Sequence, residues 1–306
     1  MLELTYRSAR GEELPLSENP LFYLTNVDGL TSASGAVASS SVGAGDGDSV
    51  NSVRVDPREI IMDLRIKPGV NVELAKREIL RVVKIKQRGT LLWTQEERTL
   101  TISGIVETVE MPRFTDAVIL QISMHCDVPY WEDLENVVSS ISGEEGLHYF
   151  TRNLDDMLFF PSEGIALSEY DTIRTKPVFN DGDVGVGAEI HIIALDKVTN
   201  PIIRDANGNF FGFGFEKQYV STDPAGNQVS SISRQEVVLS SGDELIITTH
   251  RGNKTATLNG TNIIDKVKPG STWLQVEAGE NQFSIDAVEE SVTNMSFFLM
   301  FKRRFI

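Results

Sequence analysis

Apolar and polar residues alternate with a period of two over most of this 306-residue chain, and that pattern restricts the fold more than any other feature. Neighbouring side chains of a β-strand point to opposite faces, so such alternation predicts strands with one buried face. Two long alternating runs, Thr99–Met111 and Phe114–Cys126, are separated only by Pro112 and Arg113, which predicts a β-hairpin. Further strands are predicted at Arg58–Ile66 and Gly89–Gln95.

The second half of the chain, from about Pro161 onward, carries short alternating runs at regular spacing. They are separated by glycine-containing pairs of the kind that close tight hairpins. These pairs are Asp181-Gly182, Asn207-Gly208, Gly252-Asn253 and Asn259-Gly260. Short strands with such turns predict an antiparallel β-sandwich.

Two segments predict helices. The first begins at Asn71, whose side chain can cap it, and ends near Val83. Its apolar stripe consists of Ala75, Ile79, Val82 and Val83. The second is predicted at Trp131–Ile141, because acidic residues occupy its first turn and Gly143 follows its end.

The length of 306 residues is too great for one ordinary hydrophobic core, so we expect two domains. The predicted fold class is mainly β. It combines an α+β N-terminal domain, a β-sandwich carrying a helix, with a C-terminal antiparallel β-sandwich. The expected bounds are residues 1–145 for the first domain, 146–160 for a linker and 161–306 for the second domain.

Charge restricts the partners of the chain. Lys and Arg total 28 against 44 Asp and Glu, and the net charge of −16 repels phosphate backbones. One short stretch is an exception, with six cations and a single acid, Glu78. The cations are Lys76, Arg77, Arg81, Lys84, Lys86 and Arg88. Because no aromatic residue interleaves with them, a solvated helix face, or a face opposite an acidic neighbour, is favoured over a nucleic-acid site.

The sequence contains no motif that carries chemistry. The four histidines have no second ligand at metal spacing, and there is no nucleophile elbow, phosphate loop or dinucleotide fingerprint. Asp205, Asn207, Asn209 and Glu216 follow the spacing of a calcium loop, but Phe210 stands where that loop needs glycine. We therefore expect no catalytic activity, no metal and no cofactor.

The cysteine count indicates the redox compartment of the protein, and the apolar runs indicate whether a signal peptide or a membrane helix is expected. With Cys126 as the only cysteine, an intramolecular disulfide is excluded, and a reducing cytoplasm is favoured. The alternating run around Cys126 predicts a buried side chain. No run approaches the roughly 18 apolar residues of a membrane helix, and charge and proline precede any apolar run, so neither membrane insertion nor a signal peptide is expected.

Three regions together carry a familiar order of motifs. The first half ends in the predicted hairpin and HCDVPYW, with Cys126, Pro129, Tyr130 and Trp131. The second half opens with PVFNDGDVGVGAEIHI, containing Asn180, Gly182 and Asp183. It closes with SGDELIITTHRGNKTATLNG, then TWLQVEAGENQF with Leu274, Gly279 and Asn281, then the aromatic and basic strand FFLMFKRRF. In this order the motifs resemble the distal tail proteins of long-tailed bacteriophages, the family that forms the hub below the tail tube.

The resemblance implies a hexameric ring built from the N-terminal domains, with C-terminal sandwiches that are similar to galectins and carbohydrate-binding modules. It implies a structural hub in the virion tail, assembled in the host cytoplasm, that joins the tail tube to the tail-tip apparatus. The implied partners are further copies of the chain, the major tail tube protein, the tail-associated hub or lysin protein and the tape measure protein. Receptor-binding proteins or host glycans are further candidates, and sequence-specific contact with nucleic acid is not expected.

The segment Ser32–Ser52, SASGAVASSSVGAGDGDSVNS, offers little to any core, since it has no aromatic residue and no cation. In the family the corresponding segment reaches a neighbouring subunit. We therefore expect an arm whose backbone groups pair with a neighbour's sheet edge, and a disordered loop is the alternative. The implied interface residues are Gly43, Gly45, Asp46 and Gly47 of the arm, and Lys76, Arg77, Arg81 and Lys84 of the cationic stretch.

A carbohydrate-binding adhesin is the alternative function. Sugar-binding sandwiches present flat aromatic platforms, and Trp273 is the only tryptophan of the second domain. Its place between Thr272 and Leu274 indicates a core strand position. A glycan-cleaving enzyme would need a carboxylate pair in a cleft, and the sequence singles out no such pair.

Overall fold

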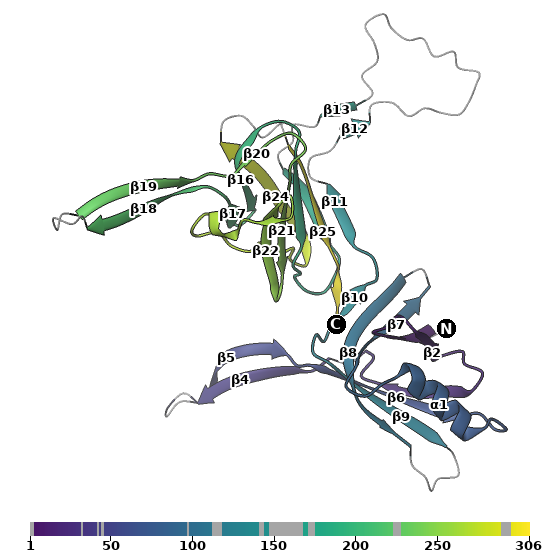
Figure 1. Cartoon of the computed structure of the whole chain (residues 1–306). Coiled ribbons are helices and arrows are strands. Elements are labelled where there is room, and N and C mark those ends of the chain that lie inside the picture. The colour runs from purple at the N-terminus through teal and green to yellow at the C-terminus, as the bar shows by residue number, and fades with distance from the viewer. Residues whose placement is uncertain are drawn as a thin grey trace, which may run out of the picture. The chain divides into compact units, whose positions relative to one another are not determined.

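The computed structural model describes residues 3–31, 33–41, 43, 46–96, 98–111, 118–140, 144–146, 168–170, 175–222, 228–288 and 295–306 (Figure 1). The chain divides into two compact units. The first comprises Met1–Glu135 together with Arg304–Ile306, and the second comprises Asn136–Arg303. Within the part of the chain that the structure describes, no helix has the length and apolar character needed to cross a membrane.

The first unit is built on one nine-stranded antiparallel sheet with the order β2-β1-β7-β8-β9-β6-β3, in which the short β10 pairs with β8 and β26. The strands are β1 (Glu3–Ser8), β2 (Glu13–Pro15), β3 (Phe22–Asp28), β6 (Arg58–Ile66), β7 (Arg88–Gln95), β8 (Arg98–Glu110), β9 (Ile119–Cys126), β10 (Trp131–Asp133) and β26 (Arg304–Phe305). Strands β8 and β9 pair from Ile105–His125 to Glu110–Gln121, which confirms the hairpin pairing predicted from their alternation. Residues 112–117, which connect them, lie outside the described residues.

Helix α1 (Val72–Val82) confirms the first predicted helix. Oδ1 of Asn71 accepts the backbone N–H groups of Glu73 and Leu74 at 3.0 and 3.2 Å, which satisfies two donors that the start of a helix leaves unpaired. The predicted apolar stripe, Ala75, Ile79, Val82 and Val83, is at most 2% exposed and shares the core of the sheet. Burying each of the larger side chains contributes about 1.5–3 kcal/mol to stability.

The second predicted helix is wrong. Its segment forms β10 (Trp131–Asp133) and β11 (Val137–Ser140). Trp131 is 1% exposed, pairs with Phe305 across the strands, and donates its Nε1–H to the carbonyl oxygen of Leu30 at 2.9 Å. These partners come from both ends of the chain, and the contacts with them outweigh the local acid and glycine signals of a helix.

The division of the chain differs from the predicted bounds in two places. Strand β11 belongs to the second unit, which therefore begins at Asn136, and Arg304–Ile306 returns to the first unit. The short strands β12 (Glu144–Gly146) and β13 (Ser168–Tyr170) pair with each other. Residues 147–160 of the predicted linker lie outside the described residues.

The second unit contains two larger antiparallel sheets, in the orders β11-β25-β15-β21-β22-β23 and β14-β24-β16-β17, with β20 beside β16. Their strands are β14 (Thr175–Asn180), β15 (Glu189–Ala194), β16 (Val198–Asp205), β17 (Phe210–Gly212), β20 (Val238–Leu239), β21 (Glu244–His250), β22 (Asn253–Leu258), β23 (Thr261–Asn262), β24 (Gly279–Val288) and β25 (Met295–Phe301), and a 3₁₀ turn, η1, spans Ile264–Lys266. Ile190 and Phe297 of the first sheet share one buried core with Val178 and Phe283 of the second. The predicted mainly-β fold is confirmed.

Candidate interaction surfaces

Strands β4 (Gly35–Ser41) and β5 (Asp48–Val55) form a hairpin on the segment for which the sequence predicts an arm. The hairpin connects β3 to β6 along the chain and extends outward from the sheet of the first unit (Figure 1). Only Ala36 and Val55 are half-buried, and every other side chain of the two strands is exposed. The segment is therefore ordered by its own cross-strand ladder, which replaces the alternative of a disordered loop.

Three of the predicted arm residues, Gly43, Asp46 and Gly47, lie in the turn of this hairpin, and Gly45 is outside the described residues. Gly43 and Gly47 have φ angles of +44° and +91°, and no atom lies within 4 Å of where a side chain would begin. Glycine is thus favoured there by the left-handed backbone and not by lack of space. Asp46 is exposed beside them.

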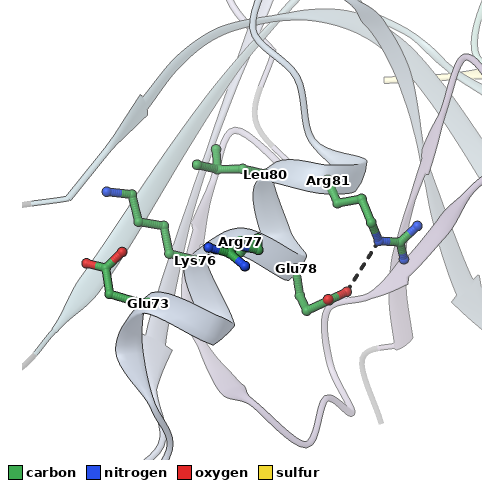
Figure 2. Close-up of a pocket in the computed structure, with 6 residues that line it drawn as sticks. All are labelled: Glu73, Lys76, Arg77, Glu78, Leu80 and Arg81. Atoms are coloured by element: carbon green, nitrogen blue, oxygen red, sulfur yellow. Dashed lines mark hydrogen bonds and ion pairs between the residues drawn. The ribbon is translucent and has the colours of Figure 1, made fainter.

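The predicted cations Lys76, Arg77 and Arg81 lie on α1, where they line a shallow depression of about 470 Å³ (Figure 2). Glu73, Glu78 and Leu80 complete its lining. Lys84 follows directly after the helix. Hence the structure brings the four predicted cations to one helix and its exit, while the arm residues gather at the tip of the hairpin.

Part of the cationic stretch is neutralised by the chain itself. Nη1 of Arg81 lies 2.8 Å from Oε1 of Glu12, and its Nε lies 3.3 Å from Oε2 of Glu78. Arg88 pairs with Asp127 at 3.0 Å, and this hydrogen bond lowers the pKa of the Asp127 carboxyl group. Such exposed pairs contribute only about 0–1 kcal/mol. Lys76, Arg77 and Lys84 have no ion-pair partner among the described residues.

The calcium-like segment forms a tight turn between β16 and β17, as the Asn207-Gly208 pair predicts. Oδ1 of Asp205 accepts the backbone N–H groups of Asn207 and Asn209 at 2.9 and 2.8 Å, and Gly208 has a φ of +82°. The Asp205 carboxylate thus holds the turn together. Groups of three or more metal-binding side chains are not found in the described part of the chain.

Cys126 and His191 are buried, and the side chains around them serve packing and pairing of the strands. Cys126 is fully buried, as predicted, and burial raises the pKa of its thiol to about 12. His191 is 8% exposed, hydrogen-bonds Glu244 through Nδ1 at 2.8 Å, and stacks on the ring of Phe298 at 4.6 Å. The sequence alone indicates no role for this histidine, because its partners come together only when strands β15, β21 and β25 pair.

The aromatic residue on which the adhesin alternative rests is not in a strand. Trp273 is half-buried, and its ring packs on Phe211 at 4.7 Å, with Nζ of Lys254 5.9 Å from the ring centroid. The predicted core strand position is therefore wrong, although the ring does pack against the core. Phe179 of β14 is the more exposed aromatic side chain, at 65%.

Comparison with known proteins shows which proteins are similar to this two-unit β fold. Residues 224–305 match the family described as the siphovirus-type tail component, C-terminal domain. No curated protein matches the chain. The crystal structure of the Dit protein (gp 19.1) of phage SPP1, described as a hub adsorption apparatus of phages that infect Gram-positive bacteria, is similar over 100% of both chains, with a TM-score of 0.64 and 12% identity.

Two structures of the phage p2 baseplate in its activated conformation are also similar, each with a TM-score of 0.44. With strontium, identity is 12% and both chains are covered fully; with calcium, identity is 11% over 99% of this chain and 98% of the other. The family match therefore assigns residues 224–305 to the class of siphovirus-type tail component domains. Within that class, the chain has the fold of a phage distal tail protein, and the resemblance predicted from its sequence is confirmed.

Proposed function

We propose that this chain is the hub subunit of a phage tail, and that six copies form a closed ring through their first units. The ring joins the tail tube to the tail-tip apparatus. Its work is assembly and not turnover, so we assign no catalytic residue, metal or cofactor.

The observation that carries the proposal is the β4–β5 hairpin on a chain with a distal tail protein fold. An isolated two-stranded hairpin is only marginally stable in water, and its open edges and exposed side chains invite a partner. The arm projects from one side of the unit and its receiving surface lies elsewhere, so copies can associate head to tail, and such a contact closes into a ring if the rotation allows.

The proposed interface residues are those at the hairpin turn, Gly43, Gly45, Asp46 and Gly47, and those on and after α1, Lys76, Arg77, Arg81 and Lys84. The further partners proposed are the major tail tube protein, the tail-associated hub or lysin protein and the tape measure protein. Receptor-binding proteins would attach through the second unit. The protein would be located in the virion tail after assembly in the host cytoplasm.

Negative-stain electron microscopy of the purified protein tests the proposal. Class averages with six-fold symmetry and a central channel are expected. Closed rings of another order would correct the number of subunits, and a field of single chains at micromolar concentration would contradict the proposal.

The alternative function, a glycan-binding adhesin, now rests on the exposed ring of Phe179 more than on Trp273. Sugar-binding sites use flat aromatic faces beside polar groups, and Phe179 is paired across the strands with Glu280. A glycan-array signal that is lost in Phe179→Ala but kept in Val238→Ala, an exposed position on β20, would support this function.

A further inference from the structure

The β4–β5 hairpin has one apolar face, which an irregularity in its pairing creates. Val37 is directly opposite Val53, and Ser39 is opposite Val50, while no residue of β4 stands opposite Asn51 because the register shifts between Ala38 and Ser39. Directly opposed residues share a face, and so do residues two apart on β4. Val37, Val53 and Val50 therefore lie on the same face.

The extra residue of β5, Asn51, is required for the three valines to share one face. Val50 and Val53 are three residues apart, and in a regular strand they would point to opposite faces. The bulge adds one residue, Asn51, between them, so that both valines lie on the same face of the hairpin. Their side chains are 58% and 70% exposed, and that of Val37 is 60% exposed.

The opposite face of the hairpin is small and polar. Its cross-strand pairs are Ala36 with Arg54, Ala38 with Ser52 and Ser40 with Ser49. The hairpin thus has one exposed apolar face and one polar face. This difference indicates that another surface covers the valines in the assembled state.

The tip of the valine face carries acids. Asp48 is opposite Ser41 and so shares the face of Val50, and its Oδ2 accepts the hydroxyl of Ser39 at 3.2 Å. Asp46 is exposed in the adjoining turn. Neither carboxylate has an ion-pair partner among the described residues.

The outer face of α1 is complementary to this surface, because it combines exposed apolar side chains with cations. Leu80 is 36% exposed and Ile85, just after the helix, is 49% exposed. Lys76, Arg77 and Lys84, which flank them, lack ion-pair partners among the described residues, whereas Arg81 is already held by Glu12 and Glu78. The hairpin extends away from α1 (Figure 1), and its valines are exposed, so it does not cover the helix of its own chain.

We propose that the valine face of the hairpin packs against the outer face of α1 in a second copy of this chain, with Asp46 and Asp48 meeting Lys76, Arg77 and Lys84. This contact rests on the proposed ring and specifies its chemistry: side-chain packing with charge complementarity, in place of the backbone pairing with a sheet edge that the sequence suggests. It is heterologous, as a ring requires, because the donating and receiving surfaces differ.

The test of the valine face measures association by sedimentation velocity over a concentration series. The double variant Val37→Thr/Val53→Thr keeps side-chain volume and branching but removes apolar surface, and we expect its association to weaken by about tenfold or more. The matched control is Ala38→Thr/Ser52→Thr, a directly opposed pair on the other face, which should associate as the wild type does. Circular dichroism spectra and melting curves check that all variants fold.

The test of the charges is a reciprocal exchange. Asp46→Lys/Asp48→Lys and Lys76→Glu/Arg77→Glu should each weaken association by at least about tenfold, and the quadruple variant should recover most of the wild-type affinity. If the valine pair associates as the wild type does, or if the exchange gives no recovery, the inference is wrong while the ring itself stands. A wild-type protein that remains a monomer at every concentration overturns both the ring and the contact.

Discussion

Hairpins β4–β5 and β18–β19 each form a two-stranded sheet of their own, and their surfaces differ. Hairpin β4–β5 of the first unit contains a bulge that collects three valines on one face. Hairpin β18–β19 of the second unit (Phe215–Thr222 and Gln228–Gln235) pairs without any register shift. Near its base the exposed pair Glu216–Arg234 is joined at 3.1 Å, and Ile232, which is 65% exposed, lies opposite Gln218.

Exposure of an apolar side chain alone therefore does not define an interface. Scattered apolar residues are ordinary on a protein surface, whereas three exposed valines on one face of a two-stranded ribbon are not. In the first hairpin the irregularity in pairing places Val50 on the face of Val37 and Val53. We therefore assign self-association to the first hairpin and not to the second.

Removing each hairpin should give the largest difference. Replacing residues 36–54 by Asn-Gly joins Gly35 to Val55, which are cross-strand partners, so the base of the hairpin closes with a tight turn. Replacing residues 217–233 in the same way joins Glu216 to Arg234. Light scattering after size exclusion should find a monomer for the first deletion and an unchanged assembly for the second. The opposite result would assign association to the second unit.

Thiol labelling should separate the hairpins by about tenfold or more in rate. Cys126, the only native cysteine, is buried with a thiol pKa of about 12, so it should not react at pH 8 until the protein unfolds. A cysteine introduced by Val53→Cys should react quickly in dilute monomer and slowly in the assembly. One introduced by Ile232→Cys should react quickly in both. Equal rates at position 53 in the two states would show that the valine face stays open.

The bulge can be tested by one residue, with a smaller effect. Inserting a threonine between Ala38 and Ser39 gives Asn51 a partner and moves Val50 to the other face, which should weaken association by about tenfold, equivalent to about 1.4 kcal/mol. Deleting Asn51 makes the ladder regular but keeps Val50 with Val37 and Val53, so association should be retained. Sedimentation velocity of the two variants compares them, and equal loss in both would mean that the bulge itself, and not the valine face, is required.

The smallest expected effect is that of calcium on the second unit. The Asp205 carboxylate is engaged by the backbone N–H groups of the β16–β17 turn, and Phe210 follows where a calcium loop needs glycine. Melting temperatures in calcium and in excess chelator should therefore agree within about a degree. A rise of many degrees with calcium would reveal a site bound by the folded state.

Local patterns in the sequence were sufficient for part of this fold. The capping of α1 by Asn71 and the hairpin turn at Asn207-Gly208 depend on residues close in sequence, and both are confirmed. The helix predicted at Trp131 was wrong because the acids of this segment and the glycine that follows it are typical of helices. The residue that pairs with Trp131 across the strands, Phe305, lies at the other end of the chain.

The valine face illustrates why interaction surfaces are harder to predict than elements. Alternation along β5 alone places Val50 and Val53 on opposite faces. The extra residue, Asn51, becomes apparent only when β4 is laid beside it and Ser39 is seen to pair with Val50. The charges of α1 were visible in the sequence, but the pairing of Arg81 with Glu12 required the folded unit.

The mass of the wild-type protein in solution shows whether six copies of the chain form the proposed ring. Native mass spectrometry of the full chain should find six times 33.9 kDa, about 203 kDa, as the dominant species at micromolar concentration. The fraction assembled should fall on dilution and with added salt, because both mass action and screening of the interface charges oppose it. A single species at 33.9 kDa across the whole concentration range would contradict the ring and, with it, the role assigned to the hairpin.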